Sequence, residues 1–192
     1  MARAENINET IVARKDASRV KSVTTASGKT WKQPPVPYNP TWPHNYVRMT
    51  ERGHIEEFDD SKGNERIHRW HKSGTYEEID VNGTKVTRIV GDSYEILDRD
   101  GNIFIKGNCN LTVVGDANIR VENDARLQVL GDMKTEVTGN YTLAVGKKFV
   151  LHAKEDINIK TDGNFMEESG GETSLEGVKI HLNSGKKVEG IE

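Results

Sequence analysis

One stretch of this sequence carries carboxylates at a spacing that catalysis could use. Glu56, Glu57, Asp59 and Asp60 form an acidic run, and paired carboxyl groups act as acid and base or nucleophile in glycoside hydrolysis. That reaction needs the two groups to face each other across a cleft, whereas an acidic run on a hairpin is typical of a solvated turn. We therefore expect these side chains to be exposed, and we predict no catalytic residues and no enzyme activity.

The histidines would bind a metal ion only if several of them converged. His68 and His71 are three residues apart in a strand-like stretch, where alternation places them on opposite faces. The other histidines are scattered along the chain, Cys109 is the single cysteine, and the C-x-x-C spacing of zinc sites is absent. We predict no metal site and no cofactor.

The composition argues against an ordinary globular domain. The 192 residues are 34% apolar, 30% charged and 6% aromatic, with 18 glycines, which suits a long object with a narrow interior better than a wide core. The net charge of -3 lacks the basic face that a nucleic-acid partner would need. No apolar run could span a membrane, and the first residues lack the apolar centre of a signal peptide. We expect synthesis and assembly in a cytoplasm.

The chain divides into regions of different pattern. Residues 1–46 hold all five prolines and are predicted to be an extended linker from upstream domains, with a possible short helix at 7–21. Residues 47–80 show alternating stretches separated by turn signals such as Ser-Gly and Asn-Gly, which predict a lead-in of antiparallel strands. Residues 81–178 follow a single repeat, and residues 179–192 form the C-terminal end.

The repeat is eight residues long. Twelve positions lie at intervals of eight residues from Gly83 to Gly171, and eight of the twelve are glycine. Asp or Asn follows directly after nine of the twelve. Such pairs tolerate left-handed backbone, so we expect a turn at each position. The predicted repeat corners are Gly83, Gly91, Gly107, Gly115, Asn123, Gly131, Gly139, Gly163 and Gly171.

Apolar residues stand two before most glycine positions and four after eight of them, and polar residues lie between them. A spacing of two is the period of a β-strand, so every six-residue strand has one dry face and one wet face. The predicted interior consists of Ile105, Val113, Ile119, Val121, Leu127, Val129, Val137, Leu143 and Val145.

Identical turns and a constant dry face predict a β-solenoid rather than a flat meander. Two arrangements fit the period equally: three octads of one chain could complete each turn, or three chains could interwind with one octad each. The periodicity does not choose between them.

The octads "VVGDANIR", "VLGDMKTE" and "VTGNYTLA" resemble the repeats of the C-terminal β-helix in the baseplate central spike of T4-like phages. The stretch "GHIEEFDDSKGNERIHRWHKSGTYEEIDVNG" resembles the lead-in to that needle, which VgrG spikes of type VI secretion share in looser form. The resemblance covers about residues 47–180. It implies an all-β fold: an interwound triple-stranded β-helix, shaped as a triangular prism, formed by a homotrimer.

The resemblance also implies a function and partners. Such a needle sits in the tail baseplate of the virion and is driven mechanically through the host outer membrane. Upstream lysozyme and OB-fold domains belong to the same spike, and a PAAR-repeat protein caps the tip. Some phage spikes hold a tip metal through His-x-His, but this chain has only His181 there. The alternatives are the shaft of a phage tail fibre or a VgrG-type secretion spike.

Arg99, Lys147 and Glu155 depart from the pattern because they occupy glycine positions. We expect those corners to turn by another means or to lie on a looped-out edge.

Overall fold

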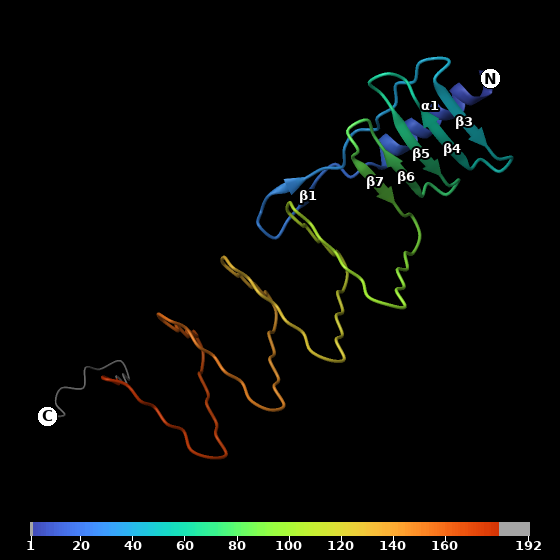
Figure 1. The fold of residues 1–192 in the computed structure, drawn as a ribbon. Helices are drawn as coiled ribbons and strands as arrows, with labels where there is room; N and C mark the ends of the chain where they lie inside the picture. The colour runs from blue at the N-terminus through green and yellow to red at the C-terminus, as the bar shows by residue number, and fades with distance from the viewer. Residues whose placement is uncertain (1, 181–192) are drawn as a thin grey trace. The chain divides into compact units, whose positions relative to one another are not determined.

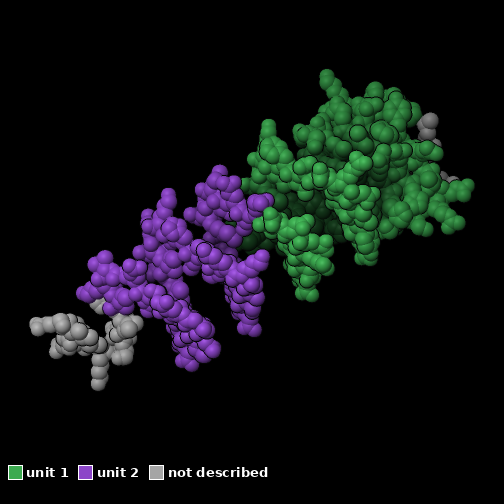
Figure 2. Space-filling model, turned by 60° about the horizontal axis from the view of Figure 1, so that its bottom comes forward, with its two compact units in different colours: residues 1–125 green, residues 126–192 purple. Residues whose placement is uncertain are grey.

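The computed structural model describes residues 2–180 of a chain that forms two units, Met1–Ala125 and Arg126–Glu192 (Figure 2). Every helix and strand among the described residues lies in the first unit. Apart from one helix, these elements are β-strands in antiparallel sheets, so the all-β class is confirmed.

The chain begins with helix α1 (Ala2–Ser18), which overlaps the range where a short helix was expected. Strands β1 (Val23–Thr24) and β2 (Thr30–Trp31) then pair as a short hairpin. The prolines all lie in residues 34–43, where the chain forms no helix or strand because each proline removes a backbone donor. Within the described residues, no helix is long and apolar enough to cross a membrane.

A five-stranded antiparallel sheet follows, with its strands in sequence order (Figure 1). Its strands are β3 (Asn45–Met49), β4 (Ile55–Asp59), β5 (Arg66–Trp70), β6 (Tyr76–Ile79) and β7 (Lys85–Arg88). Three of the hairpins share a five-residue turn in which the fourth residue is a glycine with positive φ. Gly74 has φ of 102°, and an added Cβ would lie 3.4 Å from Val90, so this turn requires glycine.

One face of this sheet forms the core of the first unit. Ile55, Trp70 and Tyr76 are buried there, with Val47 and Val86 packed beside them. Helix α1 lies along the sheet (Figure 1) and buries Ile11 in the same apolar cluster. The strands alternate strictly, so the neighbouring side chains on each strand point to the opposite, uncovered face.

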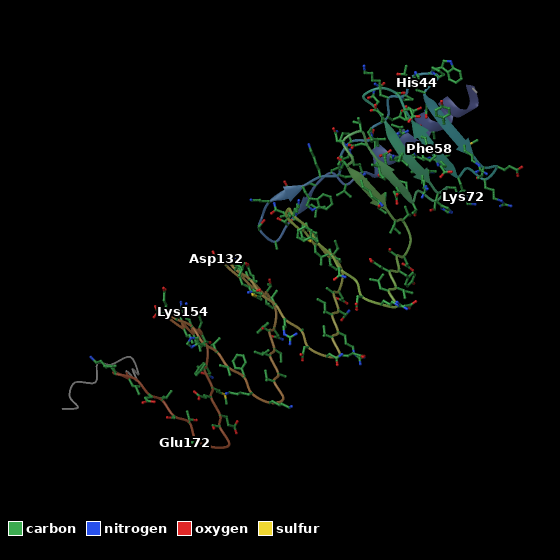
Figure 3. The ribbon with its side chains drawn as sticks, in the orientation of Figure 1. His44, Phe58, Lys72, Asp132, Lys154 and Glu172 are labelled. Atoms are coloured by element: carbon green, nitrogen blue, oxygen red, sulfur yellow. The ribbon has the colours of Figure 1, made fainter. Side chains whose placement is uncertain are left out.

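After β7 the chain continues as extended segments separated by bends. Each bend occupies two residues, the second of which is a glycine position of the octad. The bends lie at residues 90–91, 98–99, 106–107, 114–115, 122–123, 130–131, 138–139, 146–147, 154–155, 162–163 and 170–171. In the second unit the labelled Asp132, Lys154 and Glu172 each lie at or next to a bend (Figure 3).

The expected left-handed backbone at these bends is wrong. Among the described residues, positive φ occurs only at Gly28, Gly53, Gly63, Gly74 and Gly83. The first four lie in turns outside the octads, and Gly83 forms the β6–β7 hairpin. The later bends use ordinary backbone regions open to any L-residue. This conformation explains how Arg99, Lys147 and Glu155 occupy bends without glycine and without a looped-out edge.

Over residues 89–180 the single chain forms no helix or strand. In the space-filling view the second unit is thin and open, without the dense packing of the sheet region (Figure 2). The chain alone therefore does not close into a prism, and its extended segments have no strand partners of their own.

Candidate functional site: an uncovered apolar surface and a buried ionic cluster

The apolar residues of the octads are exposed in the single chain. The apolar residues that stand two places before a glycine position, from Val81 to Val145, have 44 to 62% of their surface exposed. The apolar residues that stand four places after a glycine position are more exposed. Their exposed fraction runs from 57% for Leu143 to 92% for Ile119. The residues predicted to form an interior thus keep about half or more of their surface exposed in the single chain.

The total accessible surface gives a second measure of this openness. The chain exposes 18,887 Å², whereas a globular monomer of 21.5 kDa exposes about 9,200 Å². Exposed apolar surface of this extent, rich in Val, Ile and Leu, typically marks an interaction surface.

The uncovered face of the five-stranded sheet also carries an apolar row. Tyr46, Phe58, Ile67 and Ile79 are direct cross-strand neighbours on β3 to β6. Tyr46 is 61% exposed, Phe58 43% and Ile67 42%. Cross-strand neighbours of this kind form a continuous surface, here without a partner from the described residues.

This row runs on into the octads. Ile79 pairs with Lys85 of β7, so the alternation along β7 places Thr87 and then Ile89 on the same face. Ile89 is the apolar residue two positions before the bend at 90–91 and is 45% exposed. Its neighbour Val90 lies near Gly74 in the β5–β6 turn and is 56% exposed. The uncovered face of the sheet and the dry face of the octads therefore begin in phase.

The covered face of the sheet holds an ionic cluster, defined as Lys15, Glu57, Arg66, His68 and Glu78. Lys15 extends from α1 to form an ion pair with Glu78. Arg66 donates to the same Glu78 oxygen at 2.9 Å and lies 2.6 Å from Glu57. Each of the five residues is at most 3% exposed.

Hydrogen bonds extend the cluster. His68 Nδ1 lies 3.2 Å from Glu57 Oε2, and Asn45 Nδ2 donates to Glu57 Oε1 at 3.1 Å. Two cations thus face two carboxylates around a histidine, and the cluster is neutral when His68 is neutral. A neutral buried cluster is the form in which charges are tolerated in a protein interior.

The pKa values follow from this burial. Burial lowers the pKa of Lys15 and of His68, although Glu78 and Glu57 respectively oppose the shift. Burial alone would raise the pKa of Glu57, but the hydrogen bond from His68 and the charge of Arg66 together lower it. The cluster therefore favours ionised Glu57 and neutral His68 near neutral pH.

The acidic run was expected to be a solvated turn, and for Glu57 and Asp59 this expectation is wrong. Both are 1% exposed and belong to β4. Asp59 accepts a hydrogen bond from the Ser61 backbone N–H, and Glu57 pairs with Arg66. The strand period places Glu57 and Asp59 on the face of Ile55, and this signal was available in the sequence. Lys15, which pairs with Glu78 in the same cluster, carried no comparable signal.

His68 and His71 do not converge on a common site. His68 is buried in the cluster, whereas His71 follows β5 at the surface, where its ring lies 4.5 Å from that of His54. Within the described part of the chain, no three His, Cys, Asp or Glu side chains gather as a metal site. His181 lies outside the described residues.

Comparison with known proteins gives two relatives, both from phages. Over 105 residues, 53% of this chain and 25% of the relative, it is 42% identical to Protein Gp5 of Vibrio phage KVP40. Over 78 residues, 41% of this chain and 14% of the relative, it is 38% identical to the pre-baseplate central spike protein Gp5 of Enterobacteria phage T4.

The chain therefore spans about a quarter or less of the length of these relatives. No family model matches it. The resemblance to the baseplate spikes of T4-like phages, first indicated by the octads and the lead-in, is confirmed as homology to Gp5 proteins.

Proposed function

We propose that this chain forms the shaft of the central spike in a phage tail baseplate, where three copies interwind into a triple-stranded β-helix. Its homology to Gp5 proteins supports a structural role in the baseplate of the virion. The exposed surface of the chain itself supports the trimer.

The single observation that carries the trimer is the exposed surface. The chain exposes about twice the area of a globular protein of its mass, and the excess includes the octad valines. Burying these valines needs other copies of the same octads, since every copy offers the same spacing and the same dry face. Three copies supply the three walls that enclose a narrow interior.

The backbone supports the same arrangement. Between bends each octad is a six-residue extended segment with no strand partner in its own chain, and unpaired backbone N–H and C=O groups are costly once water is excluded. In an interwound helix each segment pairs with segments of the other two chains. Such continuous ladders leave edge strands only at the two ends.

A needle of this kind acts mechanically. Its stiffness comes from the ladders, and no chain can leave without breaking hydrogen bonds along the whole shaft. Driven by tail contraction, it would pierce the host outer membrane without an active site. The matched residues make up only 25% and 14% of the relatives, and we propose upstream lysozyme and OB-fold domains and a PAAR-repeat tip protein as partners.

Light scattering on the purified chain tests the trimer. We expect a mass three times 21.5 kDa and a band that resists SDS until it is heated. A mass of 21.5 kDa would contradict the trimer and favour a single-chain solenoid.

A further inference from the structure

Helix α1 and residues 33–41, together called the N-terminal cover, lie on the buried face of the five-stranded sheet. Several of the contacts that its described residues make with the sheet region are polar. Gln33 donates to the Tyr76 hydroxyl at 2.7 Å, the Tyr38 ring lies 4.9 Å from the Arg66 guanidinium, and the Thr41 N–H donates to Ser61 at 2.6 Å. Ile11 is the buried apolar residue that the cover supplies.

Lys15 is the charge that joins the cover to the ionic cluster. It pairs with Glu78 and lies 4.4 Å from the centre of the Tyr76 ring. Without it, Glu57 and Glu78 would share the single charge of Arg66 inside the protein, which is unfavourable. The position of the helix on the sheet therefore depends on the charge state of groups buried beneath it.

We propose that the N-terminal cover is an acid-releasable clamp, which leaves the sheet when the ionic cluster takes up protons while the five strands stay paired. The proposal does not require that the chain be a trimer. It concerns the sheet and the helix of one chain.

His68 is the group of the cluster with the highest ordinary pKa in the acid range, 6.5. It faces Glu57 of β4, Arg66 of its own strand, Glu78 of β6 and Lys15 of α1, with the Tyr76 ring 6.2 Å away, and Tyr38 of the cover lines the same gap. Protonation adds a charge to a cluster that is already balanced. It also occurs beneath the helix, where water has no access.

The pH effect has the same sign for His68 and Glu57, the two acid-range groups of the cluster whose pKa values are shifted. The pKa of His68 is lowered from 6.5, so the released state binds a proton more readily, and stability is lost as the pH falls below 6.5. The pKa of Glu57 is lowered from 4.5, so a further loss occurs below 4.5. Release should therefore begin below pH 6.5 and steepen below 4.5.

The strands have a reason to stay paired during release. Their registers run without interruption from Asn45 to Arg88, and backbone hydrogen bonds do not titrate in this range. On the uncovered face, Arg69–Glu56 and Lys85–Glu77 are exposed pairs that contribute little. The acid-sensitive charges are concentrated under the cover.

Amide hydrogen exchange of the full chain, read by mass spectrometry and corrected for the intrinsic pH dependence, tests this inference between pH 7 and pH 4. We expect residues 10–18 to lose protection below pH 6.5 while residues 55–79 keep theirs. His68→Gln retains a donor for Glu57 but does not titrate, so its release should be delayed until below pH 4.5. Simultaneous loss in both segments, or no loss in either, would overturn the proposal.

Lys15→Met provides the second arm at pH 7. We expect roughly a 100-fold loss of protection confined to residues 10–18, with partial recovery in Lys15→Met/Glu78→Gln, where the cluster is neutral again. As a control, Lys85→Met removes a lysine from an exposed ion pair, Lys85–Glu77. This variant should leave the protection of residues 10–18 and of residues 55–79 unchanged. Wild-type protection in Lys15→Met, or an unshifted pH profile in His68→Gln, would show that the cluster does not hold the cover.

Discussion

Lys15 of helix α1 and Glu78 of strand β6, 63 residues apart in the sequence, form an ion pair buried beneath the helix. The pair joins the first helix to the interior of the five-stranded sheet. Arg66 donates to the same carboxylate, so removal of Glu78 affects two cations at once.

Glu78→Gln should therefore destabilise the sheet region strongly. It leaves Lys15 and Arg66 buried with one carboxylate between them, and breaking a buried ion pair typically costs about 3–5 kcal/mol. Thermal unfolding followed by circular dichroism should show a lower Tm. The adjacent Glu77 points to the other face and forms an exposed pair with Lys85, so Glu77→Gln should change stability by less than about 1 kcal/mol. Equal effects of the two substitutions would contradict the cluster's importance.

Much of the lead-in was predictable from the sequence. The alternation of apolar and polar residues and the Ser-Gly and Asn-Gly turns indicate antiparallel strands, and strands β4 to β6 lie where the pattern predicts. The period of eight likewise marks every bend, including those at Arg99 and Lys147. Local pattern is sufficient here because strand alternation and turns are local properties.

What could not be predicted depends on distant partners. Nothing near Lys15 in the sequence indicates that its charge is buried, because its partner Glu78 is brought to it by the fold. The acidic run was misread for the same reason: Glu57 is neutralised by Arg66 from the next strand. The burial of the octad valines depends on other chains, so it stays a prediction.

Val129→Lys should prevent assembly of the proposed trimer. Val129 is 45% exposed in the single chain and belongs to the predicted interior, where three like charges would meet without partners at a cost of several kcal/mol. We expect light scattering to give a smaller mass and the SDS-resistant band to disappear. Gln128 is its neighbour on the predicted wet face, so Gln128→Lys is the matched control and should assemble normally. An assembled Val129→Lys trimer would place this side chain outside the interior.

Two glycines distinguish the hairpins from the bends. Gly74 has φ of 102°, and an added Cβ would approach Val90 to 3.4 Å, so Gly74→Ala should cost about 1–3 kcal/mol. At the bend, Gly131 lacks positive φ, and an added Cβ would meet nothing within 4 Å. Gly131→Ala should therefore cost less than about 1 kcal/mol, as judged by the Tm of each variant. A large loss of stability in Gly131→Ala would instead indicate that another copy of the chain packs closely against this bend.

Tyr76 should ionise late and reduce stability in alkali. Its ring stacks on Trp70 at 5.8 Å, and burial raises the pKa of its phenol above 10.0, although the hydrogen bond from Gln33 opposes the shift. Because the folded state resists the charge, stability is present below pH 10.0 and is lost as the pH rises through the folded pKa.

The difference between the ultraviolet titration curves of wild type and Tyr76→Phe isolates this phenol, and we expect its midpoint above pH 10.0. We also expect the Tm of wild type to fall more steeply in alkali than the Tm of Tyr76→Phe. Tyr46→Phe is the matched control because Tyr46 is 61% exposed on the uncovered face. Its removal should leave the alkaline fall in Tm unchanged. A Tyr76 midpoint at or below 10.0 would mean that the N-terminal cover does not shield this ring from water.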